Sequence, residues 1–188
     1  MHASLETMAL RDAIQGRRSV RTFGPEQIER TTLLELLELA VQAPTAMHLE
    51  PWGFIVVQDK KVLQRISEQA LSGMADLPPS LHRDQDGMAD VFHGAPTLVV
   101  ICAPSAARFS QADCWLAAQN LMLGAYAMGL GTCVIGMSVA TLNSPPIRAL
   151  IGLPPDVEAV APIIVGQPLA VPPAVGRKAP RIASWIAG

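Results

Sequence analysis

The sequence predicts one globular domain in which helices and β-strands alternate around a large core. The chain has 188 residues, about the length of one domain, and half of them are hydrophobic while 16% are charged. Short uninterrupted apolar runs, at residues 54–57 and 97–103, are typical of buried strands, whereas longer stretches have helical spacing with start and stop signals. No internal repeat or linker divides the chain. We therefore expect a single domain of mixed α and β structure over residues 1–188.

The first expected elements are two helices joined by a basic segment. Residues 5–16 and 26–43 have helical patterns, and Gly24-Pro25-Glu26 marks the start of the second helix. A loop at residues 43–52 then leads to the first strand. Asp59 is the expected N-cap of a helix that continues to about residue 71.

The middle of the chain contrasts an irregular segment with two strongly apolar elements. Residues 72–94 lack a sustained apolar period, which predicts a variable and mobile surface excursion or lid. The strand at 97–103 is apolar throughout, so we expect it to be covered on both faces. The helix at 111–128 is apolar nearly all the way round, which places it in the core or against a partner.

The last third of the chain begins where Gly129-Leu130-Gly131 ends this helix. A strand at 132–135, a short helix at 146–151 and a strand at 157–165 are expected to follow. Residues 166–176 are rich in proline, which predicts an extended, non-helical arm.

The composition predicts a cytoplasmic protein with a large homodimer interface. So few charged residues leave too little polar surface for a free monomer. Charged residues at positions 6, 11 and 12 interrupt the apolar stretch that a secretory leader needs, and no eighteen consecutive apolar residues occur. The three cysteines, at 102, 114 and 133, are odd in number and lie in apolar surroundings, so we expect reduced core thiols.

Six of the fourteen basic residues lie in two short windows, Arg17-Arg18-Ser19-Val20-Arg21 and Arg177-Lys178-Ala179-Pro180-Arg181. Because the net charge is −2, this layout does not form the diffuse basic face of a nucleic-acid-binding protein. In an extended segment Arg17, Ser19 and Arg21 point to one side, which suits one compact phosphate. The alternative interpretation is that these arginines are ordinary solvated surface charges.

The loop at residues 43–52 is a second candidate for ligand binding. Its small side chains let backbone N–H groups approach a flat ligand, and its prolines keep it rigid. The alternative is an ordinary connection from helix to strand, with Trp52 as a core anchor. His48 and Glu50 form a His-x-Glu pattern, but the paired cysteines of a zinc deaminase are missing. We therefore predict no metal site, and His48 remains a candidate ligand-facing group.

Other catalytic motifs are absent from the sequence. Gly129 and Gly131 follow a helix and precede a strand, and the third glycine, Gly136, comes only after that strand, which is the wrong order for a dinucleotide fingerprint. Gly136 remains a candidate ligand-binding residue, because a strand that ends in glycine can present a bare N–H to a ligand. No nucleophile elbow, Walker loop or His-Glu-x-x-His helix occurs, so no catalytic side chain is predicted. The remaining histidines are expected in loops or on the surface, at His2, His82 and His93.

Four motifs in one order make the chain resemble the FMN-dependent nitroreductase family. They are Arg17-Arg18-Ser19-Val20-Arg21, the loop at 43–52, Leu116-Ala117-Ala118-Gln119-Asn120-Leu121, and Gly129-Leu130-Gly131-Thr132-Cys133-Val134-Ile135-Gly136. The segment from Asp156 through Val165-Gly166-Gln167-Pro168 to Trp185 looks like the family's carboxyl end, so only about 72–94 is unmatched. The resemblance implies an α+β fold with a mixed, largely antiparallel sheet flanked by helices. It also implies an intertwined homodimer with two FMN sites at the subunit interface.

The resemblance further implies which residues bind FMN. Arg17, Ser19 and Arg21 would hold the phosphate and the pyrimidine edge, and Arg18 would contribute mainly its backbone. Arg177 and Lys178 would approach the phosphate from the C-terminal side, and the backbone of Ile135 and Gly136 would lie near flavin N5. The residues of the partner subunit that would lie against the isoalloxazine are Pro44, Thr45 and Ala46.

Two residues depart from the family pattern. His48 and Glu50 stand where the family commonly has Asn and Gln. An ionised Glu only accepts hydrogen bonds and adds negative charge, so Glu50 facing the flavin would lower its reduction potential. We therefore count His48 among the cofactor-contacting residues, and both residues as candidate tuning or proton-transfer groups.

The leading hypothesis is an FMN-dependent oxidoreductase that transfers a hydride from NAD(P)H via flavin N5 to an electron-poor acceptor, such as a nitroaromatic or quinone, by a ping-pong mechanism. One alternative is a flavin-dependent dehydrogenase or reductase of a specific biosynthetic intermediate, with His48 or Glu50 transferring a proton. Another is a non-enzymatic flavin-binding protein. The expected partners are a second copy of the chain and a small-molecule acceptor, with no nucleic acid and no membrane.

Overall fold

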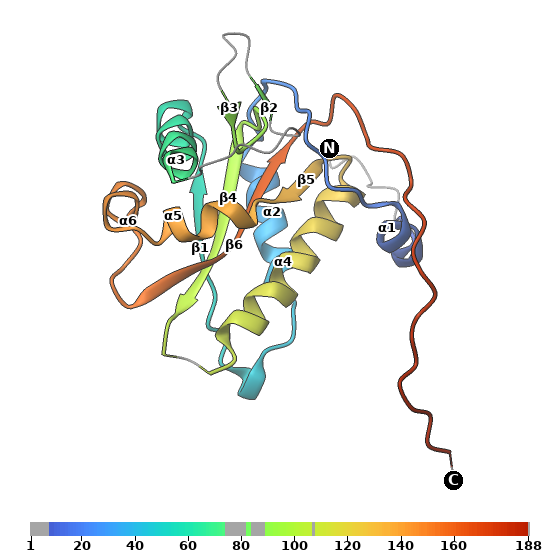
Figure 1. Cartoon of the computed structure of the whole chain (residues 1–188). Helices are drawn as coiled ribbons and strands as arrows, with labels where there is room; N and C mark the ends of the chain where they lie inside the picture. Colours follow the sequence, from blue (N-terminus) through green and yellow to red (C-terminus); the bar gives the residue numbers. More distant parts are fainter. Residues whose placement is uncertain (1–7, 74–81, 84–88, 107, 188) are drawn as a thin grey trace.

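The computed structural model describes residues 8–73, 82–83, 89–106 and 108–187 (Figure 1). Its main sheet has four strands in the order β1-β4-β6-β5, and every neighbouring pair is antiparallel. These strands are β1 (Gly53–Val57), β4 (Thr97–Pro104), β6 (Val157–Gly166) and β5 (Gly131–Val134). A second, two-stranded ladder pairs β2 (His82–Arg83) with β3 (Ala89–Asp90). The predicted α+β class with a largely antiparallel sheet is confirmed.

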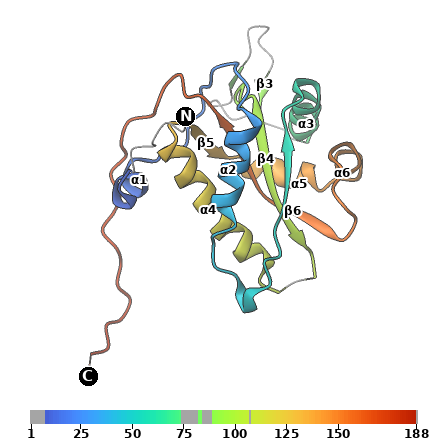
Figure 2. The ribbon, with the colours of Figure 1, turned by 180° about the vertical axis from the view of Figure 1, so that it is seen from behind.

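Helices cover both faces of the main sheet (Figures 1 and 2). On one face lie α2 (Arg30–Ala40) and α4 (Ser110–Ala127), and on the other lie α3 (Lys60–Ser72), α5 (Val139–Leu142) and α6 (Pro145–Ile151). Alternate residues of β4 point to opposite cores: Leu98 packs on the α3 side and Val99 on the α2–α4 side. This two-sided burial explains why the strand is apolar throughout, as the sequence predicted.

Local capping signals set several of the helix ends. The Asp59 carboxylate accepts the Lys61 and Val62 amides at 2.8 and 3.1 Å, which confirms it as the N-cap of α3. Gly129 and Gly152 have φ values of 76° and 70° where α4 and α6 end. Glycine reaches this left-handed region without steric cost, so both helices stop sharply.

Two predicted helices are shorter in the structure than in the sequence analysis. Within the described residues α1 spans only Leu10–Gly16. The second predicted helix begins at Arg30 instead of residue 26, because residues 25–29 are held by the body of the protein. Ile28 is buried there and its carbonyl accepts Gln58 Nε2 at 2.9 Å. This tertiary contact outweighs the local proline signal.

The expectation of a surface excursion at 72–94 is wrong for its last residues, and much of it lies outside the described residues. Val91, Phe92 and His93 are buried, and the Val91 amide donates to the buried Ser67 hydroxyl at 3.0 Å. His93 lies in a turn, one of the two places expected for it, with a φ of 56°, but it is buried.

The C-terminal arm leaves the body of the molecule as an extended chain past α1 (Figure 1), as the proline-rich sequence predicted. It carries large apolar side chains into solvent, including Trp185 at 80% and Ile186 at 95% exposure. Among the described residues, no helix has the length and apolar character needed to cross a bilayer.

Candidate functional site

The segment with the first arginines lies along the edge of the main sheet. Ser19 forms a parallel bridge with Thr132 of β5, and the Val20 amide donates to the Thr132 carbonyl at 2.9 Å. The Val20 side chain is buried against Gly131, where an added Cβ would lie 2.9 Å from Val20 Cβ. Because side chains alternate along an extended chain, Ser19 and Arg21 lie on the other side.

Three predicted site residues influence the pKa of one thiol of β5. Burial raises the pKa of Cys133, although the charge of Arg21, a hydrogen bond with the Ser19 side chain and the charge of Arg17 act in the opposite direction. Arg17, Ser19 and Arg21 thus lie close enough to affect the same buried group. That they hold one phosphate stays a prediction.

The arginines of this segment differ in what they bind. Arg18 Nη1 donates to the carbonyls of Gln15, Gly16 and Arg17 at 2.7 to 2.9 Å, so this side chain is used to complete the end of α1. In the described part of the chain, neither Arg17 nor Arg21 forms an ion pair with a carboxylate. These two guanidinium groups are therefore available for an external anion.

The beginning of the C-terminal arm lies beside this segment. The Gly24 amide donates to the Gln167 carbonyl at 2.9 Å, and the Leu169 amide donates to the Thr22 carbonyl at 3.0 Å. Residues 22–24 and the first residues of the arm therefore lie side by side, next to Arg21. Arg177 and Lys178 lie farther along the arm, where they are exposed, and no contact with the first arginines is seen among the described residues.

A cavity of about 270 Å³ opens where these segments meet. Its lining includes Arg17, Arg18, Tyr126, the turn at 129–132 and, from the arm, Pro168 and Val171. Ligand pockets usually hold roughly 300–1,000 Å³, so this volume suits part of a mononucleotide, with the remainder to be supplied by other surfaces. A second cavity of about 340 Å³, between α3 and the turn around Phe92, contains none of the predicted site residues.

Gly136 follows β5 and faces open space. The Ile135 amide donates to the Pro162 carbonyl at 2.9 Å and the Ile135 carbonyl accepts Ser138 Oγ at 2.8 Å, so the preceding residue is fixed. A Cβ added at Gly136 would meet no atom within 4 Å. Within the described residues the Gly136 amide has no backbone acceptor, which leaves a bare N–H for a ligand.

The loop at residues 43–52 has anchored ends and an exposed, strained tip. Ala43 is buried and Trp52 packs against the core, whereas the side chains around η1 (Ala46–His48) point outward. Met47, His48 and Glu50 have φ values of 54°, 56° and 45°, although none of them is glycine. Such left-handed residues each cost roughly 1 kcal/mol or more, and they cluster at functional sites. The left-handed residues favour a functional loop. Trp52 is also a core anchor, as expected if the loop only connects a helix to a strand.

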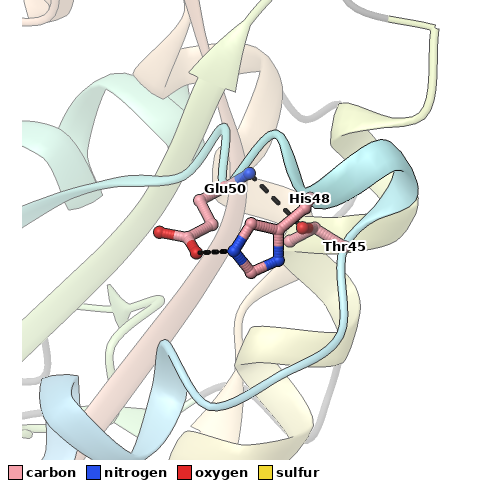
Figure 3. A network of polar contacts seen from close by, with 3 residues as sticks. All are labelled: Thr45, His48 and Glu50. Atoms are coloured by element: carbon pink, nitrogen blue, oxygen red, sulfur yellow. Dashed lines mark hydrogen bonds and ion pairs between the residues drawn. The ribbon is translucent and has the colours of Figure 1, made fainter.

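His48 and Glu50 form a pair at this tip, with His48 Nε2 lying 3.2 Å from Glu50 Oε1 (Figure 3). The Glu50 amide also donates to Thr45 Oγ1 at 3.3 Å. The two side chains are 92% and 58% exposed. An ion pair this exposed adds little to the stability of the loop.

One residue of this region, Asp113, was not predicted from the sequence. It is only 4% exposed, in the first turn of α4, and its Oδ1 accepts the Ala46 amide at 3.2 Å. An acidic residue inside a strongly apolar helix was visible in the sequence, but its partner in a loop 67 positions away was not. In the described part of the chain, no group of three or more metal-ligating side chains lies close enough to hold an ion.

These features fit a flavin mononucleotide. The phosphate needs cationic donors: Arg17 lines the cavity, Arg21 lies in the same segment, and neither pairs with a carboxylate among the described residues. The flavin ring needs a flat space with a free backbone donor, which the open side of Gly136 provides.

Comparison with known proteins identifies the class to which this fold and site belong. The profile of the Nitroreductase family matches residues 14–167, so the chain belongs to the Nitroreductase family. The predicted family membership is confirmed.

The most similar solved structures include a nitroreductase with bound FMN from Bacteroides fragilis. It is 26% identical with a TM-score of 0.80, over 94% of this chain and 98% of that one. An FMN-dependent nitroreductase from Clostridium difficile is 27% identical with a TM-score of 0.76, over 92% and 98%. Among curated relatives, an NADH dehydrogenase of Thermus thermophilus is 28% identical over 89% of this chain and 91% of its own length.

Proposed function

We propose that this chain is an FMN-dependent oxidoreductase that uses NAD(P)H to reduce a small electron-poor acceptor, such as a nitroaromatic or quinone. The observation that carries the proposal is that Arg17, which lines the cavity beside residues 167–169 of the arm, and Arg21 of the same segment have no carboxylate partner among the described residues. FMN in the Bacteroides fragilis relative and the NADH dehydrogenase activity named for the Thermus thermophilus relative support the cofactor and the reductant.

Each site residue has a distinct part in this proposal. Arg17, Ser19 and Arg21 bind the phosphate, while Arg177 and Lys178 add positive charge from the arm. The Gly136 N–H, held in place by the fixed Ile135, donates toward flavin N5. When bound, FMN supplies the chemistry by accepting a hydride from NAD(P)H and passing it to the acceptor. The protein supplies placement and exclusion of water, so no side-chain nucleophile is required.

A second copy of the chain completes the proposed site. Both sheet-covering helices on one face expose large apolar side chains, including Leu39 of α2 and Trp115 and Leu116 of α4, and the arm exposes Trp185. Surfaces of this kind are typical of protein–protein interfaces. We propose a homodimer in the cytoplasm in which residues 1–188 form one FMN-binding unit. The Pro44, Thr45 and Ala46 of the partner subunit lie against the flavin, and His48 of the partner subunit lies beside them.

The His48–Glu50 pair favours a second candidate function. A histidine hydrogen-bonded to a carboxylate can deliver a proton to a substrate that has received a hydride. A reductase of one specific intermediate would use this pair, whereas a broad-range nitroreductase has no need of it. A non-enzymatic flavin-binding protein is the remaining alternative. Loss of the flavin's visible absorbance on anaerobic addition of NAD(P)H excludes it.

The arginine pair gives the direct test of the cofactor assignment. Arg17→Gln and Arg21→Gln each remove a charged donor, and a hydrogen bond to a charged group contributes about 1.5–3 kcal/mol. We expect each substitution to weaken FMN binding by roughly 10- to 100-fold, measured by quenching of flavin fluorescence. Arg65→Gln, on the exposed side of α3, is the matched control and should leave the affinity unchanged. If Arg17→Gln and Arg21→Gln bound FMN as tightly as the native protein and Arg65→Gln do, the proposed phosphate site would be excluded.

A further inference from the structure

Asp113 is a buried carboxylate whose hydrogen bond runs to the loop at residues 43–52. Only 4% of it is exposed, and its Oδ1 accepts the Ala46 amide at 3.2 Å. Burying an ionised carboxylate costs several kcal/mol unless hydrogen bonds and favourable charge offset the loss of water. The first turn of the 18-residue helix α4 provides part of that charge, because the helix N-terminus is positive.

The hydrogen bond from the Ala46 amide to Asp113 differs from the others in the tip of the loop, because it runs to another element. The other hydrogen bonds of the tip are internal: the His48 amide donates to the Thr45 carbonyl at 3.4 Å, the Leu49 amide to the Ala46 carbonyl at 3.2 Å, and the Glu50 amide to Thr45 Oγ1 at 3.3 Å. In the described part of the chain, the Ala46 amide makes the hydrogen bond that joins residues 45–50 to another element. The tip is thus tied to the helix layer at one point.

The strain of the tip makes this single attachment important. Met47, His48 and Glu50 all occupy the left-handed region, and their side chains are exposed. Without a restraint, non-glycine residues relax to extended or right-handed conformations that cost less. A fixed Ala46 at the start of η1 holds the chain at the point where the strained residues begin.

We propose that Asp113 is a positioning residue that holds the loop in the conformation in which it meets the flavin of the partner subunit. The inference rests on the proposed function for the flavin contact, but the restraint on the loop itself does not require a cofactor. Asp113 touches neither the flavin nor the acceptor. It acts through Ala46, which places Thr45 on one side and the His48–Glu50 pair on the other.

The restraint is tested first without cofactor, by amide hydrogen exchange of residues 43–50 in the purified protein. Asp113→Ala removes the acceptor, and we expect exchange at Ala46 to become at least tenfold faster. Asp113→Asn keeps an acceptor of the same shape without the charge and should remain within about threefold of the native rate. Asp113→Leu, an apolar side chain of similar reach, is a second acceptor-free variant should Asp113→Ala fail to fold.

The consequence for the site is tested with FMN. Both acceptor-free variants should weaken FMN binding about tenfold and change the visible circular dichroism of the bound flavin, while Asp113→Asn restores both properties. Cys114→Ala, in the same buried turn of α4 but without a bond to the loop, is the matched control for general destabilisation. The inference is overturned if Ala46 exchange is unchanged in folded acceptor-free variants, or if Cys114→Ala weakens FMN binding as much. Native protein that binds no FMN would instead contradict the proposed function, and Ala46 exchange would still decide whether Asp113 holds the loop.

Discussion

At the scale of single residues, two glycines near β5 show how the same amino acid serves two purposes. Gly131 is required by packing, because an added Cβ would lie 2.9 Å from Val20 Cβ and Cγ1. Gly136 has no such neighbour and no left-handed φ, so the fold of one chain does not require glycine there. The space beside Gly136 therefore points to a ligand. The sequence already marked Gly136 as a bare donor, but not the contrast with Gly131.

This contrast predicts opposite results for two substitutions. Gly136→Val should leave the free energy of unfolding within about 0.5 kcal/mol of native, as surface changes usually do, yet reduce FMN affinity at least tenfold. Gly131→Ala should lower the free energy of unfolding by about 1–3 kcal/mol, because it overpacks the contact with Val20. Urea unfolding and flavin titration measure the two effects. A Gly136→Val protein with native FMN affinity would remove Gly136 from the site.

The buried thiols give a second prediction at this scale. Burial, with smaller effects from Cys102 and Asp113, raises the pKa of Cys114 to about 12 from an ordinary value of 9.0. Below pH 9 the Cys114 thiol is neutral in both folded and unfolded chains. Above pH 9 this thiol ionises in the unfolded chain before it ionises in the folded chain. The free energy of unfolding therefore falls as pH rises from about 9 toward 12, by up to about 1.4 kcal/mol per pH unit. Cys114→Ala should flatten this slope in urea unfolding at alkaline pH, and an equally steep slope would contradict the assignment.

At the scale of elements, the sequence predicted strands and caps better than helix boundaries. The β4 run, the Asp59 cap and the proline-rich arm were correct because each depends on local residues or on burial of both faces. The predicted start of α2 was wrong because Gln58, in another segment, donates a hydrogen bond to the Ile28 carbonyl, and the helix begins only at Arg30. The left-handed tip of the loop was not foreseen, since Met47, His48 and Glu50 are not residues that favour it.

The tip of this loop carries the prediction that separates the two enzyme hypotheses. If the His48–Glu50 pair delivers a proton, Glu50→Gln and His48→Asn should each reduce kcat about 10- to 100-fold with a specific acceptor and alter the shape of its pH profile. FMN affinity should change less than threefold, because neither residue holds the phosphate. Thr141→Val, a half-buried change in α5 away from this loop, serves as the control. Unchanged pH profiles in both variants would leave the pair without a part in catalysis.

At the scale of the whole molecule, the site depends on segments that are far apart in sequence. Residues 22–24 pair with residues 167–169, and Ser19 pairs with Thr132, so the segment after α1, the start of the arm and β5 meet at one edge of the sheet. That both arginine-rich windows bind one ligand stays a prediction, because Arg177 and Lys178 lie farther along the arm, where they are exposed. The sequence could not show that the Arg18 side chain donates to carbonyls at the end of α1, or that Asp113 accepts the Ala46 amide. Both hydrogen bonds depend on the folded arrangement of the chain.

The exposed apolar side chains of α2, α4 and the arm are explained in the proposal by a second chain that covers them in a homodimer. Native mass spectrometry of the purified protein with FMN tests this most directly, because it reads chain number and flavin number together. The account predicts a particle of two chains carrying two FMN molecules. A single chain that takes up no FMN, even with the flavin in large excess, would contradict it.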